Sequence, residues 1–321
     1  MVSQNKKVRL AELAGKAAAK AAGSSAAPAY RSWDDRIVSA IAYLFVSAVA
    51  LVMLYPVLNV FAVAFSSYRS YSLNPWIFFP YDINLDAFRT VFASRLIMNS
   101  YVNTLFITVT GTILTLIITV MTAYPLSREG FCGKPLFMSL LIFTMMFNGG
   151  IVPNFLLIKG IGLYDNIWAL IIPGILSAFN VILMINFFKA LPDGLIEAAK
   201  VDGAGELRTL WQIVVPLSKP ILSTIALFAA VGYWNSYFSA IMYIRRQALW
   251  PVQLVLREII MAANTAMINS GGNMAEMDLG NIPIDSLRYA SLVVVMLPIM
   301  CIYPFLQKYF AKGVLLGAVK G

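Results

Sequence analysis

Six stretches of this chain contain no charged residue and are each long enough to cross a lipid bilayer. They cover residues 37–68, 96–127, 135–158, 166–188, 220–244 and 289–307. A helix needs about 20 apolar residues to span the hydrocarbon core, so each stretch can hold one span. The spans must be helices, because lipid offers no partner to an unpaired backbone N–H or C=O group. The pattern therefore predicts an all-α membrane protein with six transmembrane helices.

The overall composition supports this class. Of the 321 residues, 60% are hydrophobic and 12% are charged, whereas soluble domains carry about 25% charged residues. A seventh uncharged stretch, residues 259–275, is rich in Asn, Ser, Thr and Gly. We expect this stretch to form an outside loop with a short helix rather than a span.

The distribution of Lys and Arg predicts the orientation of the chain. With six spans both termini lie on one side of the membrane, and that side carries 16 of the 24 basic residues. Basic residues accumulate on cytoplasmic loops. We therefore expect a cytoplasmic tail over residues 1–36, a six-span domain over residues 37–321, and two cytoplasmic termini. The net charge of +9 then reflects topology and gives no reason to expect nucleic acid as a partner.

The sequence carries no energy source of its own. No carboxylate or Lys lies near the middle of a span, whereas ion-coupled carriers usually keep an ionisable residue there. This disfavours a secondary carrier, which remains an alternative. The P-loop pattern that binds ATP is also absent, so ATP would have to be bound by another subunit. Histidine is absent, and we find neither a metal site nor a catalytic constellation, so an enzyme is not expected.

The segment of residues 191–216 is polar for such a chain and lies in a predicted cytoplasmic loop. Pro192 and Asp193 are typical of a helix start, with the Asp193 side chain as the cap. The Asp202-Gly203 turn ends this first helix. In a second helix, four apolar residues fall on one face and Pro216 ends the helix: Leu207, Leu210, Trp211 and Val214. The alternative is a loop that lies on the membrane surface.

This segment resembles the cytoplasmic signature of membrane subunits in binding-protein-dependent ABC importers. The signature is EAA, three residues, Gly, nine residues, and Ile-x-Leu-Pro. Here it reads Glu197-Ala198-Ala199, then Gly203, then Ile213-Val214-Val215-Pro216. Val215 replaces Leu, which is a mild apolar change. The chain looks most like the maltose-type carbohydrate branch, in the subgroup assigned to complex oligosaccharides and uronate-containing sugars.

The resemblance implies a type I ABC importer permease fold in the bacterial cytoplasmic (inner) membrane. It implies three protein partners and a sugar: a second homologous permease, an ABC ATPase dimer, an extracytoplasmic solute-binding protein and the transported sugar. ATP and Mg would be bound by the ATPase, with no cofactor in this chain. The two short helices would act as coupling helices that dock on the ATPase. The residues that carry this role would be Glu197, Ala198, Ala199, Asp202, Gly203, Leu207, Trp211 and Pro216, with Leu207 and Trp211 holding the second helix against the permease. A non-sugar solute remains an alternative substrate.

Aromatic and uncharged hydrogen-bonding side chains in the fifth span suit a sugar path. They are Tyr233, Trp234, Asn235 and Tyr237. Ordinary packing between helices is the alternative interpretation. The following outside loop carries a second group, which the resemblance places near the binding protein: Arg245, Arg246, Trp250 and Arg257. These arginines would also favour an acidic sugar, although a solvated loop is the preferred explanation.

The third span contains a cluster of Gly and Pro. The run Asn148-Gly-Gly-Ile-Val-Pro153 predicts a bent or interrupted helix, which membrane proteins tolerate where neighbours or a water-lined cavity satisfy the freed backbone groups. A simple helix end would give the same pattern.

Overall fold

The computed structural model describes residues 33–67, 69–70, 76–269 and 284–318. The predicted tail thus lies mostly outside the described residues. These residues are helical or irregular, apart from one isolated bridge between Ser66 and Ile83. The chain divides into residues 1–58 and residues 59–321. The first unit holds most of helix α2 (Trp33–Ala64).

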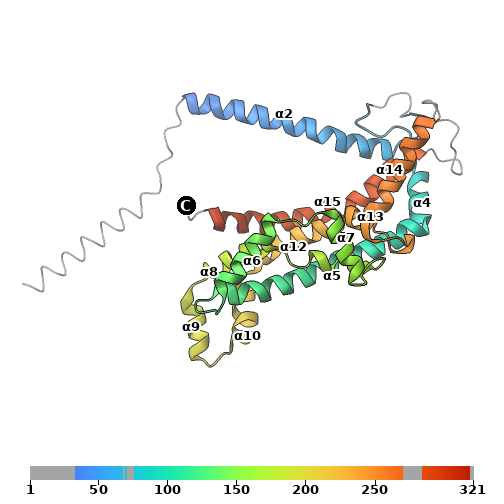
Figure 1. Cartoon of the computed structure of the whole chain (residues 1–321). Coiled ribbons are helices and arrows are strands. Elements are labelled where there is room, and N and C mark those ends of the chain that lie inside the picture. Colours follow the sequence, from blue (N-terminus) through green and yellow to red (C-terminus); the bar gives the residue numbers. More distant parts are fainter. Residues whose placement is uncertain (1–32, 68, 71–75, 270–283, 319–321) are drawn as a thin grey trace, which may run out of the picture. The chain divides into compact units, whose positions relative to one another are not determined.

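The second unit holds all other helices of the described residues (Figure 1). In chain order they are α4 (Asp86–Ala93), α5 (Arg95–Ser127), α6 (Lys134–Met146), α7 (Ile151–Gly160), η1 (Ile167–Leu170), η2 (Ile172–Gly174), α8 (Ala178–Lys189), α9 (Asp193–Val201), α10 (Glu206–Thr209), η3 (Leu210–Val214), α11 (Val215–Leu217), α12 (Lys219–Trp234), α13 (Tyr237–Tyr243), η4 (Gln247–Leu249), α14 (Val252–Asn269) and α15 (Ile284–Ala318).

Among the described residues, three helices are long and apolar enough to span a membrane, and they lie within α2, α5 and α15. Three further pairs reach that length together but bend sharply at a short break. The pair α6 and α7 bends by 119°, the pair of residues 167–174 and α8 by 44°, and the pair of residues 206–217 and α12 by 82°. The first break confirms the interruption that residues 148–153 predict, and Gly150 adopts a φ of +87° there. Glycine reaches this conformation without steric cost.

Helix α14 corrects the prediction for residues 259–275. We expected a loop with a short helix, but the helix runs over 18 residues from Val252 to Asn269, and residues 270–283 lie outside the described ranges. Its length follows from packing. Val255 is buried with Val293 and Val294 of α15, and Val252 is buried with Val295. An apolar face buried over several turns stabilises a helix that the polar residues alone do not predict.

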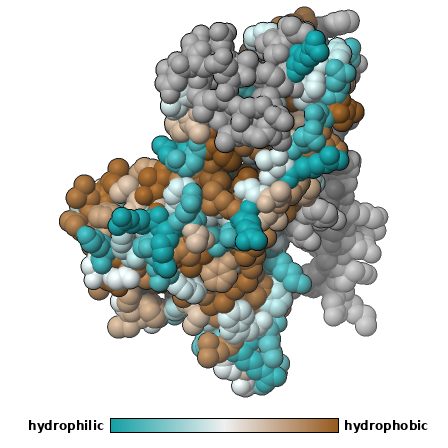
Figure 2. Space-filling view, turned by 90° about the vertical axis from the view of Figure 1, so that its right-hand side faces the viewer, coloured by the Kyte–Doolittle hydropathy of each residue, from teal (hydrophilic) through white to brown (hydrophobic). Residues whose placement is uncertain are grey.

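Helices α5, α8 and α12 form the centre of the second unit (Figure 1). Their largest shared cluster includes Tyr124 of α5, Phe188 of α8 and Ile225 of α12, and it also takes in Leu210 and Val214 of η3. By contrast, α6 has no buried residue and α7 has one. Figure 2 shows hydrophobic side chains exposed over large parts of one face. Such exposed apolar surface fits contact with lipid or with another subunit.

Candidate coupling segment and substrate cavity

The predicted first helix of the signature segment is helix α9. It begins at Asp193, with Pro192 as the cap residue and no side-chain cap hydrogen bond, so the capping role expected of Asp193 is wrong. Asp193 instead lies in the first turn, where a carboxylate is favoured by the helix dipole. Glu197 and Ala198 point outward and are exposed, whereas Ala199 is buried. Of the two alanines, only Ala198 is therefore available to an approaching partner.

The turn at Gly203 is a Schellman motif, a helix end closed by a left-handed residue. Gly203 has a φ of +74°, its N–H donates to Lys200 O at 3.0 Å, and the Ala204 N–H donates to Ala199 O at 2.9 Å. Both bonds use carbonyl groups that the helix end leaves unpaired. A Cβ added at Gly203 would meet no atom within 4 Å. The glycine is therefore required for its backbone conformation and not for space.

The second helix departs from the predicted stripe. Residues 206–209 form one α turn, residues 210–214 form a π-helix, and helical turns continue through Leu217, one residue past Pro216. The Val215 N–H bonds to Leu210 O, five residues back. This wide turn changes the angular spacing of the side chains.

The packing expected for Leu207 and Trp211 is wrong. Thr209, Leu210 and Val214 form the buried side, while Leu207 is 69% exposed and Trp211 is 47% exposed. The two side chains therefore do not hold the helix against the rest of the chain. Val201 of α9 is 87% exposed as well, so the segment presents three exposed apolar side chains.

A polar contact that sequence reasoning missed joins this segment to α5. The Tyr124 hydroxyl donates to Glu206 Oε2 at 2.6 Å, and Lys200 Nζ lies 3.0 Å from Glu206 Oε1. Glu206 is the tenth residue of the signature run, but the motif assigns it no role. The Tyr124 side of the contact is 82 residues away in sequence, so no local pattern could have revealed it.

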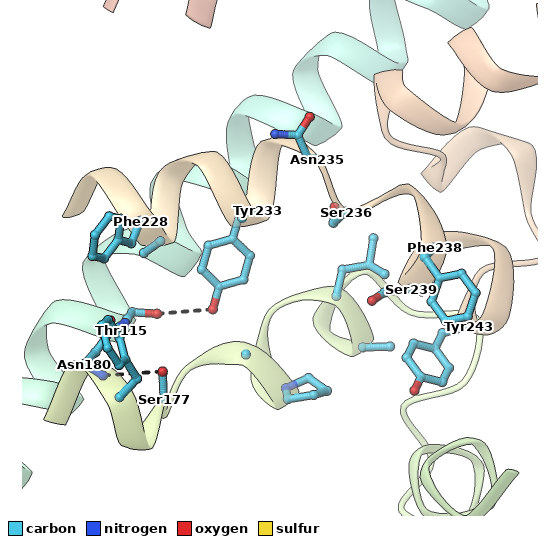
Figure 3. A pocket seen from close by; sticks show the side chains of 17 residues that line it. Thr115, Ser177, Asn180, Phe228, Tyr233, Asn235, Ser236, Phe238, Ser239 and Tyr243 are labelled. Carbon is cyan, nitrogen blue, oxygen red and sulfur yellow. Dashed lines mark hydrogen bonds between the residues drawn. The ribbon is translucent and has the colours of Figure 1, made fainter. Parts of the chain in front are cut away.

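A cavity of about 710 Å³ opens beside Tyr233 (Figure 3). Its 17 lining residues come from α5, the η1–η2–α8 region, α12 and α13, and none is charged. The polar groups include Thr115, Ser177, Asn180 and Ser239, and the aromatic groups include Phe228, Phe238 and Tyr243. Such a mixture of aromatic faces and neutral polar groups suits a polyhydroxylated ligand.

Tyr233 stands at the centre of the contacts around this cavity. Its hydroxyl lies 3.2 Å from Thr115 Oγ1 and donates to Ile171 O at 3.1 Å. The ring lies against Gly111, where an added Cβ would come within 2.6 Å of it. Figure 3 shows the side chain pointing from α12 toward Thr115. Tyr233 thus fixes the distance between α5, α12 and the η2 turn.

The structure separates the four predicted path residues into two pairs. Tyr233 and Asn235 line the cavity, and Asn235 Oδ1 also accepts a hydrogen bond from Gln253 at 3.1 Å. Trp234 and Tyr237 do not line it. Trp234 packs with Val252, Leu256 and Val295 on the other side of α12, because adjacent residues of a helix point in different directions. Tyr237 begins the next helix and is exposed.

The predicted outer-loop residues also take different places. Arg257 pairs with the neighbouring Glu258 at 3.2 Å, and Trp250 accepts a hydrogen bond from Asn103 at its carbonyl. Arg246 forms an ion pair with Asp165 at 2.9 Å, and the backbone N–H groups of Arg245 and Arg246 donate to the same carboxylate. The hydrogen bond from the Arg246 backbone N–H is the main reason that the pKa of Asp165 is lowered.

The Asp165–Arg246 contact joins two walls of the cavity. Asp165 immediately precedes the η1–η2 wall, and its N–H donates to Tyr243 O of the α13 wall at 2.8 Å. Asp165 also adopts a φ of +57°, a conformation that Asp tolerates better than most residues. We call this set of contacts the Asp165 clasp. Among the residues that the structure describes, no group of His, Cys, Asp and Glu could hold a metal ion.

Comparisons with known proteins relate this geometry to a family of transport proteins. A family model described as "Binding-protein-dependent transport system inner membrane component" matches residues 116–316. The polygalacturonan/rhamnogalacturonan transport system permease protein YtcP of Bacillus subtilis (strain 168) is 40% identical over 290 residues, covering 89% of this chain and 99% of that protein. The melibiose/raffinose/stachyose import permease protein MelC of the same organism is 31% identical over 252 residues, covering 77% and 84%.

A solved structure agrees with these relatives. A chain from the crystal structure of a bacterial ABC transporter involved in the import of the acidic polysaccharide alginate matches with a TM-score of 0.79 and 35% identity. The match covers 88% of this chain and 100% of that chain.

Proposed function

Because the chain belongs to the family of binding-protein-dependent transport system inner membrane components, we propose that it is the permease subunit of an ATP-driven importer of oligosaccharides. The observation that carries this proposal is the signature segment: an exposed pair of short helices on a chain that has no ATP-binding motif of its own. Relatives named for sugar-polymer and oligosaccharide transport support the substrate class.

The proposed topology has six spans and two cytoplasmic termini, in the bacterial cytoplasmic membrane. It is supported by three long apolar helices and by two bent pairs that coincide with uncharged stretches of the sequence, while the stretch at residues 220–244 holds α12 and α13. The 16 basic residues on the proposed cytoplasmic side support the orientation.

The proposed partners are a second permease, an ABC ATPase dimer with its ATP and Mg, and an extracytoplasmic binding protein. Helices α9 and α10 would dock on the ATPase. The exposed apolar side chains of Val201, Leu207 and Trp211 offer area to bury, and Ala198 allows close approach. Glu197 supplies a charge without an ion-pair partner among the described residues. This combination of an apolar anchor and a peripheral charge fits a protein–protein contact.

The proposed substrate path runs through the cavity beside Tyr233. We infer that the transported oligosaccharide contains uronate units, as the names of the polygalacturonan and alginate relatives suggest. All 17 lining residues are uncharged, so the cavity would contact hydroxyl groups and ring faces. Carboxylates of the sugar would then be recognised by the sister permease or the binding protein.

Reconstitution of the permease with its partner subunits in proteoliposomes tests the function. We expect uptake of a labelled oligogalacturonide that requires both ATP and the binding protein. Uptake driven by an ion gradient without ATP would instead indicate a secondary carrier, and ATP-dependent uptake of non-sugar solutes alone would indicate another substrate class.

A matched pair of variants tests the cavity. Ser239→Trp places a large side chain in the cavity lining, and we expect it to abolish uptake. Tyr237→Trp enlarges an exposed residue two positions away that does not line the cavity, and we expect near-normal uptake. Equal effects of the two substitutions would remove the cavity from the substrate path.

A further inference from the structure

We propose that Glu206 is a positioning residue that ties the signature helices to α5, so that a displacement of these helices moves the wall of the substrate cavity. The inference rests on the proposed function, and it adds a specific connection between the coupling segment and the cavity. We call the contacts of Glu206 with Tyr124 and Lys200 the Glu206 latch.

The latch holds three elements with one carboxylate. Glu206 is the first residue of α10, Oε1 lies 3.0 Å from Lys200 Nζ of α9, and Oε2 accepts from Tyr124 of α5 at 2.6 Å. Hydrogen bonds to an ionised carboxylate are short and about twice as strong as neutral ones. The two short helices and the end of α5 are therefore linked at a single side chain.

The two sides of the latch differ in how firmly they are held. Tyr124 is buried in the main core cluster, its ring stands edge-on to Phe188 at 6.3 Å, and the Arg128 guanidinium lies 4.6 Å above it. The side chains of Glu206 and Lys200 are more than half exposed. A force on the exposed short helices is therefore delivered to a side chain that is fixed in the core.

The α5 helix connects the latch to the cavity. Thr115 lies nine residues before Tyr124 on the same helix, about 13.5 Å along the axis. Its Oγ1 lies 3.2 Å from the Tyr233 hydroxyl, and both residues line the cavity. Because α5 is one uninterrupted helix from Arg95 to Ser127, a shift at Tyr124 is carried to Thr115 with little loss.

Three variants test the latch in the complete transporter in proteoliposomes. Tyr124→Phe removes only the hydroxyl, Glu206→Ala removes the whole contact, and Glu206→Gln keeps an oxygen that accepts from Tyr124. We expect the amount of sugar imported per ATP hydrolysed to fall roughly tenfold in the first two, because a hydrogen bond to a charged group is lost. Glu206→Gln should recover most of this ratio.

The nearby Arg208–Gln212 pair provides the control. Arg208 Nε donates to Gln212 Oε1 at 2.9 Å on the same segment, and this hydrogen bond is exposed and joins neither α5 nor α9. Gln212→Ala should leave the ratio unchanged. The double variant Tyr124→Phe/Glu206→Ala should be no worse than Glu206→Ala, because both changes break one interaction.

The outcomes separate the latch from the proposed function. If the unmodified transporter imports sugar with ATP but the Tyr124 and Glu206 variants keep its ratio, the latch is wrong and the function stands. If these variants reduce the yield of assembled complex without changing the ratio, Glu206 has only a structural role, and the latch is equally wrong. If the unmodified transporter shows no ATP-dependent uptake, the proposed function itself fails.

Discussion

Gly111 is the position where the smallest substitution should have the largest effect on the packing of the second unit. A Cβ at this position would lie 2.6, 2.7 and 2.8 Å from three ring atoms of Tyr233. These separations are about an ångström shorter than a normal carbon–carbon contact. Gly111→Ala therefore forces the Tyr233 ring away from α5.

The structure allows the magnitude to be worked out. Overpacking a buried site by one methyl group costs about 1–3 kcal/mol. A displaced ring also loses its hydrogen bonds to Thr115 and Ile171, at about 1 kcal/mol each. We expect a loss of about 3–5 kcal/mol, which corresponds to a fall of roughly 6–20 °C in the unfolding midpoint on the scale for domains of 150–250 residues.

Thermal unfolding of the purified permease in detergent measures this loss. Gly232→Ala is the matched control, since its added Cβ would meet no atom within 4 Å and alanine favours a helix. The double variant Gly111→Ala/Tyr233→Ala should cost less than the sum of its parts, because removal of the ring relieves the clash. If Gly111→Ala and Gly232→Ala unfold at the same temperature, the contact of Tyr233 with α5 is wrong.

Two further predictions concern the Gly203 turn and the Asp165 clasp. Gly203→Ala should destabilise the turn between α9 and α10 by about 1 kcal/mol and lower the amount of sugar imported per ATP, because Gly203 has a positive φ. Gly203→Asn should cost less, since Asn tolerates this conformation better than Ala. Equal import by both variants and the unmodified chain would contradict the role of this turn. The stability that the Asp165 clasp gives the folded chain should depend on pH. Folding lowers the pKa of Asp165, so this stabilisation is present above the unfolded pKa of about 3.9 and is lost as the pH falls through the folded pKa. The difference in unfolding midpoint between the unmodified chain and Asp165→Asn should therefore shrink below about pH 4, and a difference that stays constant down to pH 3 would contradict the clasp.

The sequence predicted the long helices and the two short helices of the signature segment, because both depend on local patterns. Uncharged stretches located the long helices and two of the bent pairs, and the Gly and Pro residues at 148–153 located the break between α6 and α7. The Asp202-Gly203 turn also followed from local backbone preferences.

The errors have a common physical origin in packing and long-range contacts. In residues 206–217 the buried side holds Thr209, Leu210 and Val214, while Leu207 and Trp211 are exposed, and the spacing of apolar residues did not reveal which side packs against the core. The Glu206 latch and the Asp165 clasp join residues about 80 positions apart. A single sequence holds no signal for such pairs. Nor can it divide Tyr233, Trp234, Asn235 and Tyr237 into cavity and packing roles, because that division depends on how α12 packs against its neighbours.

Glu197→Lys tests the central claim, that the signature segment couples this permease to an ATPase. The side chain is exposed on α9, so the substitution should leave the folding of the chain intact and place a like-sized side chain of opposite charge at the proposed contact. The measurement is ATP hydrolysis by the assembled complex with and without sugar-loaded binding protein. We predict that the variant complex assembles but loses its stimulation by the loaded binding protein. Full stimulation in an assembled Glu197→Lys complex would contradict the coupling role of this segment.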